Sequence, residues 1–157
     1  MYKAILVPHA GTPAGDNALK HAIHAAKNSS AKIIILHIIE EIQRPPISFG
    51  LAESEREKIF DSIKDANESI RQEMEKVMEK LSQQCNDESI ETKVKVEMGD
   101  AAEIILDTIQ NENIDLVVMA KRRKLKGVKK LLSLGSVSRK VVENVTCPVI
   151  LLDVDNT

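Results

Sequence analysis

The sequence contains few residues that could form cross-links, stack on nucleic-acid bases or bind a metal ion. It has two cysteines in 157 residues, Cys85 and Cys147, with neither the CxxC spacing of a redox pair nor the clustering of a zinc site. Tryptophan is missing and aromatic residues make up 2% of the chain, so stacking platforms for single-stranded nucleic acid are scarce. We therefore expect no metal site and a reducing, cytoplasmic location, and the scarcity of aromatic residues disfavours binding of nucleic acid.

Long hydrophobic runs and an excess of one charge are also missing. No stretch approaches the roughly 20 apolar residues of a membrane-spanning helix, and the first residues do not resemble a secretory signal. The formal net charge is −2 although 29% of the residues are charged, so nothing draws the whole molecule to a membrane or a polyanion. The length is that of one domain, which we expect to span residues 1–157.

Short apolar, β-branched runs alternate with amphipathic stretches along the chain. This alternation is typical of βα units around a parallel sheet that is buried on both faces. The runs predict five strands, at Lys3–Pro8, Lys32–Ile39, Thr92–Met98, Asp115–Met119 and Pro148–Val154.

Helix-start signals occur between these runs. Thr12 followed by Pro13 is typical of an N-cap and the first helical residue. Asp100 with Glu103 three residues later has the arrangement of a capping box, and Gly135 directly precedes a further start. These signals predict helices over Pro13–Lys27, Ala101–Glu112 and Ser136–Asn144.

A longer helix is predicted between the second and third strands. Its apolar residues recur at steps of three and four, so they form one stripe that we expect to pack on the sheet. The segment Glu40–Glu53, which contains Pro45-Pro46 and Gly50, is predicted to be the longest loop and is a candidate cover for a ligand cleft. The stripe consists of Ile59, Ile63, Ala66, Ile70, Met74, Val77 and Leu81.

Right-handed crossovers between these elements predict a single α/β, doubly wound domain. The strand order 3-2-1-4-5 is expected for a five-stranded parallel sheet of this kind, with helices on both faces. In this order the winding reverses between the first and fourth strands, and ligands bind at the carboxyl ends of the strands that flank such a reversal. This places a cleft between Pro8–Thr12 and Ala120–Ser136.

Several short motifs, in this order and spacing, resemble the universal stress protein family. The resemblance implies a five-stranded α/β protein that forms a homodimer through its last strand, and one branch of that family binds ATP in the same cleft. The motifs are Tyr2-Lys3-Ala4-Ile5-Leu6-Val7-Pro8 with Gly11-Thr12, Leu36-His37-Ile38, Gly99-Asp100-Ala101-Ala102-Glu103-Ile104, Leu134-Gly135-Ser136-Val137-Ser138 and Cys147-Pro148-Val149.

The sequence departs from the ATP-binding pattern of that family at three positions. Gly135-Ser136 keeps the helix start, whose free N–H groups would receive phosphate, but Ala120 and Arg123 stand where the pattern has glycine. The interval from Ala120 to Gly135 is two residues longer than in the pattern, and Ala10 replaces an aspartate that contacts the nucleoside. The expected ligand is ATP or AMP, with Mg²⁺ only beside the nucleotide, and the expected ATP grip is weakened. The predicted nucleotide site comprises Pro8, Ala10, Ile38, Met119, Ala120, Arg122, Arg123, Gly127, Gly135, Ser136, Val137 and Ser138.

The interval between the fourth strand and the last helix is strongly basic. Its charges are compatible with a solvated loop, with binding of phosphate groups or an acidic partner surface, or with contact to nucleic acid, and the first alternative is the commonest for such runs. The basic residues are Lys121, Arg122, Arg123, Lys124, Lys126, Lys129 and Lys130.

The remaining polar candidates predict no catalytic residue. His9 and His37 are interpreted as structural histidines, and His21 and His24 share a helical face without a third metal ligand. Ser136 has no base beside it, so its hydroxyl is interpreted as a helix cap, and weak ATP hydrolysis is the most that we expect. Two functions remain open: a nucleotide-responsive stress protein with a protein partner, or a nucleotide-independent dimeric interaction module that uses the basic loop.

Overall fold

Five strands form one parallel sheet in the order β3-β2-β1-β4-β5, which confirms the predicted fold class and strand order. The computed structural model describes residues 1–42, 50–121 and 135–153. Every predicted strand is observed within two residues of its expected ends, the usual scatter of element boundaries. The strands are β1 (Ala4–Pro8), β2 (Lys32–Ile39), β3 (Thr92–Met98), β4 (Leu116–Lys121) and β5 (Val149–Asp153).

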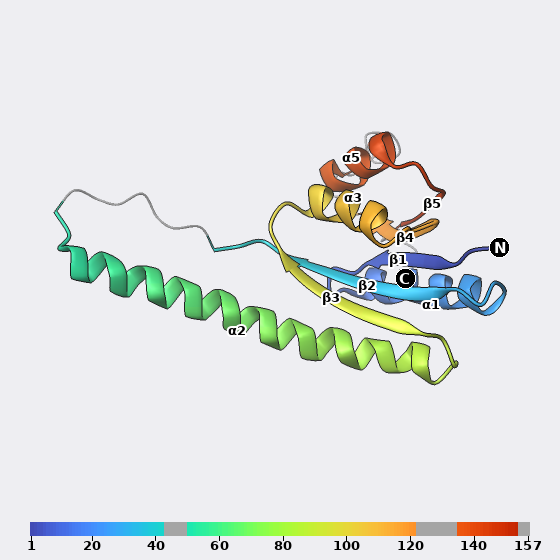
Figure 1. Ribbon diagram of the computed structural model, residues 1–157, viewed down its shortest axis with the longest axis horizontal. Coiled ribbons are helices and arrows are strands. Elements are labelled where there is room, and N and C mark those ends of the chain that lie inside the picture. The colour runs from blue at the N-terminus through green and yellow to red at the C-terminus, as the bar shows by residue number, and fades with distance from the viewer. Residues whose placement is uncertain (43–49, 122–134, 154–157) are drawn as a thin grey trace.

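Helices cover both faces of this sheet (Figure 1). α1 (Pro13–Lys27) and α2 (Glu53–Asn86) lie on one face, and α3 (Ala101–Asn111) and α5 (Ser136–Asn144) lie on the other. Two separate hydrophobic clusters fill the layers between helices and sheet. The doubly wound arrangement is therefore present, and it places the carboxyl ends of all five strands at one edge of the sheet.

The central strand β1 divides its side chains between the two layers. Ile5 and Val7 pack into the cluster beneath α1 and α2, whereas Ala4 and Leu6 pack into the cluster beneath α3 and α5. This alternation follows from the period of two along a strand. β1 pairs with β2 on one side and with β4 on the other, so the winding of the chain reverses at β1 and β4.

The predicted helix caps are present on α1 and α3. The Thr12 hydroxyl accepts a hydrogen bond from the Gly15 amide at 3.3 Å, and Pro13 occupies the first turn, where a missing N–H is tolerated. The Asp100 carboxylate accepts from the Glu103 amide at 2.9 Å. That hydrogen bond is the main reason why the pKa of Asp100 lies below its ordinary value.

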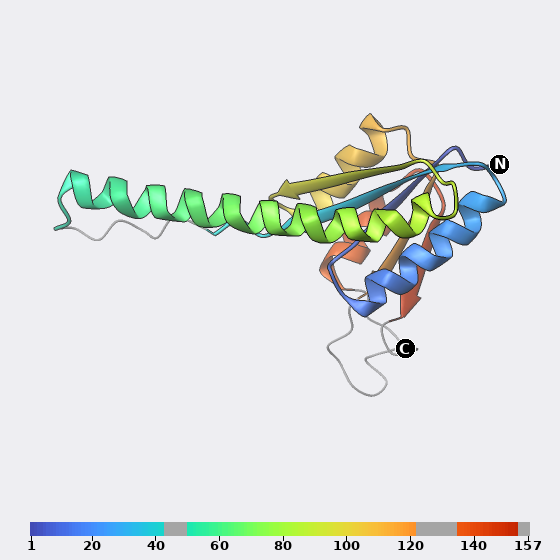
Figure 2. The same cartoon turned by 90° about the horizontal axis from the view of Figure 1, so that it is seen from below.

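The expected packing of the α2 stripe on the sheet is confirmed for Ile70, Met74 and Leu81, which pack against the core cluster, and is wrong for Ile59 and Val77. α2 has 34 residues, about 50 Å at 1.5 Å per residue, and its N-terminal half extends past the sheet (Figure 2). Ile59 and Val77, both assigned to the stripe, are 38% and 39% exposed, whereas Met78 is fully buried. The helix extends beyond the strands that could cover it, and the fully buried Met78 lies next to the predicted stripe.

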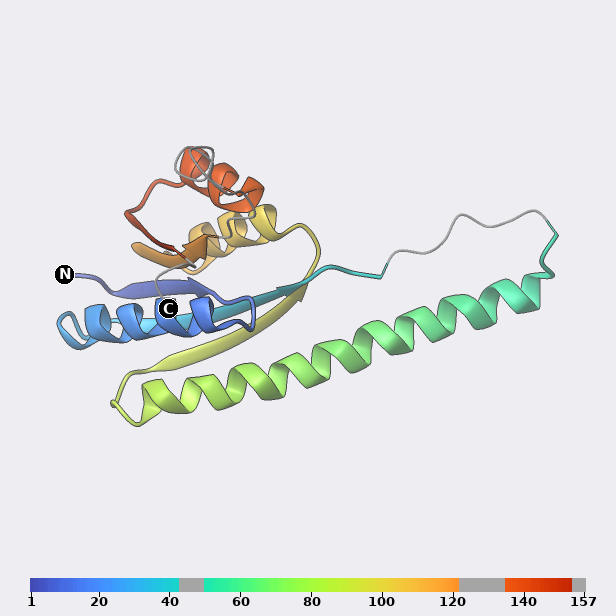
Figure 3. The same ribbon diagram turned by 180° about the vertical axis from the view of Figure 1, so that it is seen from behind.

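The segment that follows β2 runs beside α2 (Figure 3). The buried Asn67 side chain accepts a hydrogen bond from the Ile42 amide at 3.0 Å and donates one to the Ile42 carbonyl at 3.4 Å. Residues 43–49 lie outside the described residues. The described start of the predicted Glu40–Glu53 loop is thus attached to α2 and not to the ends of β1 and β4, contrary to the expectation of a cleft cover.

Candidate functional site

The carboxyl ends of β1, β2 and β4 carry an apolar floor on the α3 and α5 side of the sheet. Ile38, Met119 and Val137 belong to one hydrophobic cluster, although they come from β2, β4 and α5. Pro8 is half-buried at the end of β1, and strand alternation places it on the same side as Leu6. The structure therefore brings these four predicted site residues to one layer, where an apolar ring could lie.

The start of α5 provides polar backbone beside this floor. Gly135 is the N-cap, with an extended conformation and no side-chain cap, and its carbonyl accepts from the Arg139 amide at 2.9 Å. The first-turn N–H groups of a helix have no intrahelical acceptor, and the helix dipole adds partial positive charge there. This terminus can receive an anion such as a phosphate.

Two polar side chains of this helix differ in exposure. Ser136 is the first helical residue and is exposed, so the expectation that its hydroxyl caps the helix is wrong, because the cap position belongs to Gly135. Ser138 is 4% exposed. Ser136 therefore faces solvent at the N-terminal end of α5, while Ser138 contributes to the interior.

The β1 side of the predicted cleft consists of a short loop whose central residue is Ala10. Ala10 is exposed and carries only a methyl group, so its side chain cannot form a hydrogen bond with a ligand. Gly11 follows with φ +71°, a left-handed conformation that suits glycine. This side of the cleft therefore offers backbone groups where the family pattern has a carboxylate.

His9 lies on the opposite face of β1, packed against the first turn of α1. Its side chain is 2% exposed, and Nε2 lies 3.0 Å from Oδ1 of Asp16. Its Nδ1 accepts a hydrogen bond from the Gly11 amide at 3.0 Å. The interpretation of His9 as a structural histidine agrees with its burial, and the structure adds Asp16 as a partner that the sequence did not indicate. Asp16 lies in the first turn of α1, seven residues after His9 and beyond the loop between them. Neither the helical nor the strand period predicts a contact at this spacing.

The electrostatic state of His9 follows from these surroundings. Burial is the largest effect and lowers the pKa of His9, while the Asp16 carboxylate opposes that shift and His37 adds to it. His37 is also buried, and its Nδ1 donates to the His9 carbonyl at 2.7 Å, as expected for a satisfied core histidine. Both histidines thus act on backbone groups of the loop.

The β4 side of the cleft is described only at its start. Ala120 is half-buried and pairs with Leu152 of β5, and Lys121 forms an ion pair with Asp153 at 3.8 Å. The predicted site residues Arg122, Arg123 and Gly127 lie outside the described residues, as do the basic residues Lys124, Lys126, Lys129 and Lys130.

The described residues contain no group of three or more His, Cys, Asp or Glu side chains that could hold a metal ion. His21 and His24 are both exposed on α1. Within the same described ranges, no helix is both long and apolar enough to cross a membrane.

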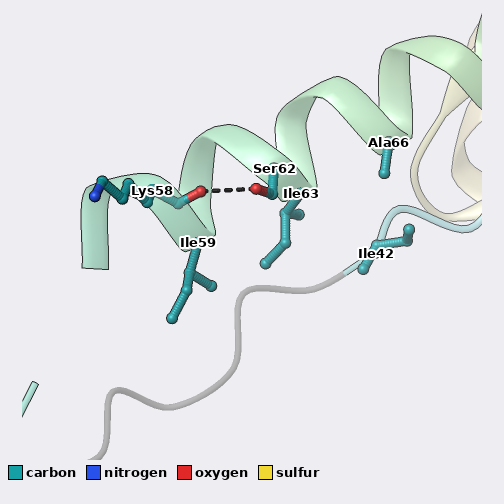
Figure 4. A pocket seen from close by; sticks show the side chains of 6 residues that line it. All are labelled: Ile42, Lys58, Ile59, Ser62, Ile63 and Ala66. Carbon is teal, nitrogen blue, oxygen red and sulfur yellow. Dashed lines mark hydrogen bonds between the residues drawn. The ribbon is translucent and has the colours of Figure 1, made fainter. Parts of the chain in front are cut away.

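A pocket occurs away from the predicted cleft, on the projecting half of α2 (Figure 4). It measures about 330 Å³ and lies between Ile42 and the helix. Its lining is mostly apolar, because Ile42, Ile59, Ile63 and Ala66 contribute to it. The Ser62 hydroxyl donates its hydrogen bond to the Lys58 carbonyl of the same helix. Its helical wall consists of Lys58, Ile59, Ser62, Ile63 and Ala66.

Comparison with known proteins shows one family across the chain. The model of the "Universal stress protein family" matches residues 1–153. Universal stress protein YxiE of Bacillus subtilis is 28% identical over 152 residues, covering 97% of this chain and 99% of that protein. Universal stress protein MJ0531 of Methanocaldococcus jannaschii is also 28% identical, covering 97% of this chain and 82% of the relative.

Solved structures show the same fold. That of the hypothetical protein MJ0577 aligns with a TM-score of 0.78 at 24% identity, covering 100% of this chain and 99% of the other. A universal stress protein family protein from Arabidopsis thaliana with AMP bound aligns with a TM-score of 0.62 at 18% identity, covering 96% and 91%. A universal stress protein in complex with cAMP also gives 0.62, at 16% identity, covering 96% and 97%.

Proposed function

Because the chain belongs to the universal stress protein family, we propose that it is a stress-response regulatory protein that binds an adenine nucleotide at the ends of β1 and β4. The observation that carries this proposal is the uncapped start of α5 beside an apolar floor. An adenine ring is flat and apolar on its faces, while its phosphates need N–H donors, and these two features supply both requirements. Relatives of the same fold bind AMP and cAMP.

The nucleotide lies with its base on Ile38, Met119 and Val137 and its phosphate at the start of α5. Ala10 offers no carboxylate to orient the nucleoside, so binding of ATP is weaker than in a protein that has such a contact. The Lys and Arg side chains of the basic loop add positive charge that compensates in part. Because AMP, cAMP and ATP share the nucleoside, the missing carboxylate weakens the binding of all three.

Calorimetric titration of nucleotide-free protein with AMP, cAMP and ATP, with and without Mg²⁺, tests this function. The variant Ser136→Glu places a carboxylate at the first helical residue, where it competes with phosphate while suiting the helix dipole. It should weaken binding about tenfold, equivalent to roughly 1.4 kcal/mol. Gln110→Glu adds the same charge on the exposed side of α3 and should bind like the wild type. Flat traces at millimolar concentrations of all three nucleotides would contradict the proposal.

A second function is favoured by the departures at Ala10, Ala120 and Arg123. If they abolish the ligand grip, the protein acts as a nucleotide-independent dimeric module that captures an acidic partner with its basic loop. Reversing the charges of Arg122, Arg123 and Lys124 to glutamate should then weaken partner capture from cell extract. Unchanged capture at matched ionic strength would count against this alternative.

A further inference from the structure

Both peptide groups that flank Ala10 are held by histidine. In the peptide group before Ala10, the His9 carbonyl accepts a hydrogen bond from His37 Nδ1 at 2.7 Å. In the peptide group after Ala10, the Gly11 N–H donates a hydrogen bond to His9 Nδ1 at 3.0 Å. The His9 amide itself donates to the Leu36 carbonyl at 2.8 Å, which extends the β1–β2 pairing to this point. The backbone at the exposed Ala10 is therefore fixed from both sides.

These contacts define the protonation state of His9. Asp16 Oδ1 can only accept while it is ionised, so His9 Nε2 must carry a hydrogen. The Gly11 amide can only donate, so Nδ1 must present its lone pair. The neutral imidazole with hydrogen on Nε2 satisfies both partners. A second proton, placed on Nδ1, would point at the Gly11 N–H and remove that hydrogen bond.

The ring packs closely against the first turn of α1. A Cβ on Gly15 would lie 2.8 to 3.0 Å from three ring atoms of His9, so the imidazole rests directly on the α1 backbone. The charged or titratable groups that face it are Asp16 from α1 and His37 from β2. On the α2 side, the neighbour of Gly11 is Met74, which carries no charge.

We propose that His9 is the positioning residue for the β1 side of the nucleotide cleft, and that only its neutral imidazole holds the Ala10 backbone in the binding conformation. This inference rests on the proposed nucleotide function. Protonation of His9 frees the Gly11 amide, and the loop then samples conformations that do not bind, so the apparent affinity falls with the fraction of competent protein. By linkage, a bound nucleotide makes His9 harder to protonate.

Two substitutions separate the hydrogen bond from the titration. His9→Asn keeps a side-chain acceptor for the Gly11 amide and cannot titrate, whereas His9→Phe keeps a ring and offers no acceptor. The probe is cAMP, because its phosphodiester keeps one negative charge between pH 8 and pH 5. At pH 8 we expect His9→Asn to bind cAMP like the wild type and His9→Phe to bind about tenfold more weakly, because the Gly11 amide loses the acceptor that fixes the loop.

The pH dependence gives the second readout. Between pH 8 and pH 5 the wild type should lose affinity for cAMP several-fold more than His9→Asn does. Equal losses in these two proteins would overturn the proposal, even if His9→Phe fails to fold.

Hydrogen exchange of the Gly11 amide in the ligand-free protein gives a third readout that needs no nucleotide. Exchange should accelerate at pH 5 in the wild type relative to His9→Asn, after correction for the intrinsic rate, and unchanged protection would refute the positioning role. If AMP, cAMP and ATP all fail to bind at pH 8 while exchange of the Gly11 amide responds to pH as expected, the proposed function is refuted and the hydrogen bond between His9 and Gly11 still stands.

Discussion

Gly15 sets how closely the imidazole of His9 packs on α1. Replacing glycine by alanine inside a helix normally stabilises a protein by up to about 1 kcal/mol. At this position the new Cβ would overlap the His9 ring, with 2.8 Å to Cε1 and 2.9 Å to Nε2. We therefore expect Gly15→Ala to lower the free energy of unfolding by about 1–3 kcal/mol, the usual cost of overpacking. Urea unfolding at pH 7.5 measures it.

The His9→Ala background provides the control for this substitution. Without the ring, the Cβ added by Gly15→Ala meets no overlap, so the substitution should become neutral or stabilising there. A double-mutant cycle then gives a coupling energy between the two positions. If Gly15→Ala costs the same in both backgrounds, the contact between ring and helix does not limit the packing.

The depressed pKa of His9 predicts a pH dependence of stability. Burial is the main cause, so the folded protein holds this proton less tightly than the unfolded chain, whose histidine has the ordinary value of 6.5. The stability is full above pH 6.5 and decreases as the pH falls through the folded-state pKa. One group contributes at most about 1.4 kcal/mol per pH unit to this slope. Urea unfolding between pH 7.5 and pH 5.5 should show the loss.

Carboxylates act in a different window and do not obscure this effect. Asp100 and Glu112 also have lowered pKa values, because of a backbone hydrogen bond and of Lys93 respectively, so their contributions are lost in more acidic solution. His9→Asn should remove most of the slope between pH 7.5 and pH 5.5. A slope that is the same in His9→Asn would assign it to other groups.

Along α2, the neighbouring residues Val77 and Met78 face opposite environments. Met78 is fully buried in the core cluster between α2 and the sheet, while Val77 is 39% exposed. Met78→Ala removes buried atoms from a closed core and should lower the free energy of unfolding by about 2–5 kcal/mol. Val77→Ala is the matched control and should cost less than about 1 kcal/mol, because a half-solvated side chain loses little burial. Comparable costs for both would contradict the observed orientation of the helix.

The orientation of α2 is the part of the fold that its sequence predicted least well. Helix formation followed directly from the three-and-four spacing, and short β-branched runs predicted the strands because parallel sheets bury both faces. The spacing does not say where the sheet ends along a helix, so Ile59 looked like a core residue although it lies on the projecting half. The burial of Asn67 was not predicted either. Its hydrogen-bond partner is the backbone of Ile42, and a backbone partner produces no pattern of side chains in the sequence.

At the scale of the whole molecule, sequence rules located the point where the winding reverses, because strand order alone defines it. Ile38, Met119 and Val137 were predicted individually and do share one layer. The pairing of His9 with Asp16 was missed because it depends on the exact turn between β1 and α1. Long-range polar contacts of this kind arise from the fold and leave no periodic signal in the chain.

β5 lies at the edge of the sheet, and this position predicts how two copies of the chain assemble. Its outer hydrogen-bonding edge pairs with no other strand of the described chain, and Ile150 is 37% exposed on it. An unpaired apolar edge favours pairing with a second copy of the same strand, as the family resemblance also implies. Sedimentation equilibrium at micromolar concentration should therefore give a dimer mass. Ile150→Asp should raise the dimer dissociation constant at least about tenfold, because it buries a charge at the new junction.

Val77→Asp is the matched control, since Val77 has nearly the same exposure but lies on α2, beside the opposite edge of the sheet. It should leave the dimer unchanged, because the added charge stays in solvent. Circular dichroism of both variants checks that the fold is retained. A wild type that sediments as a monomer contradicts assembly through β5. A dimer that survives Ile150→Asp but dissociates with Val77→Asp would instead assign the interface to the α2 layer.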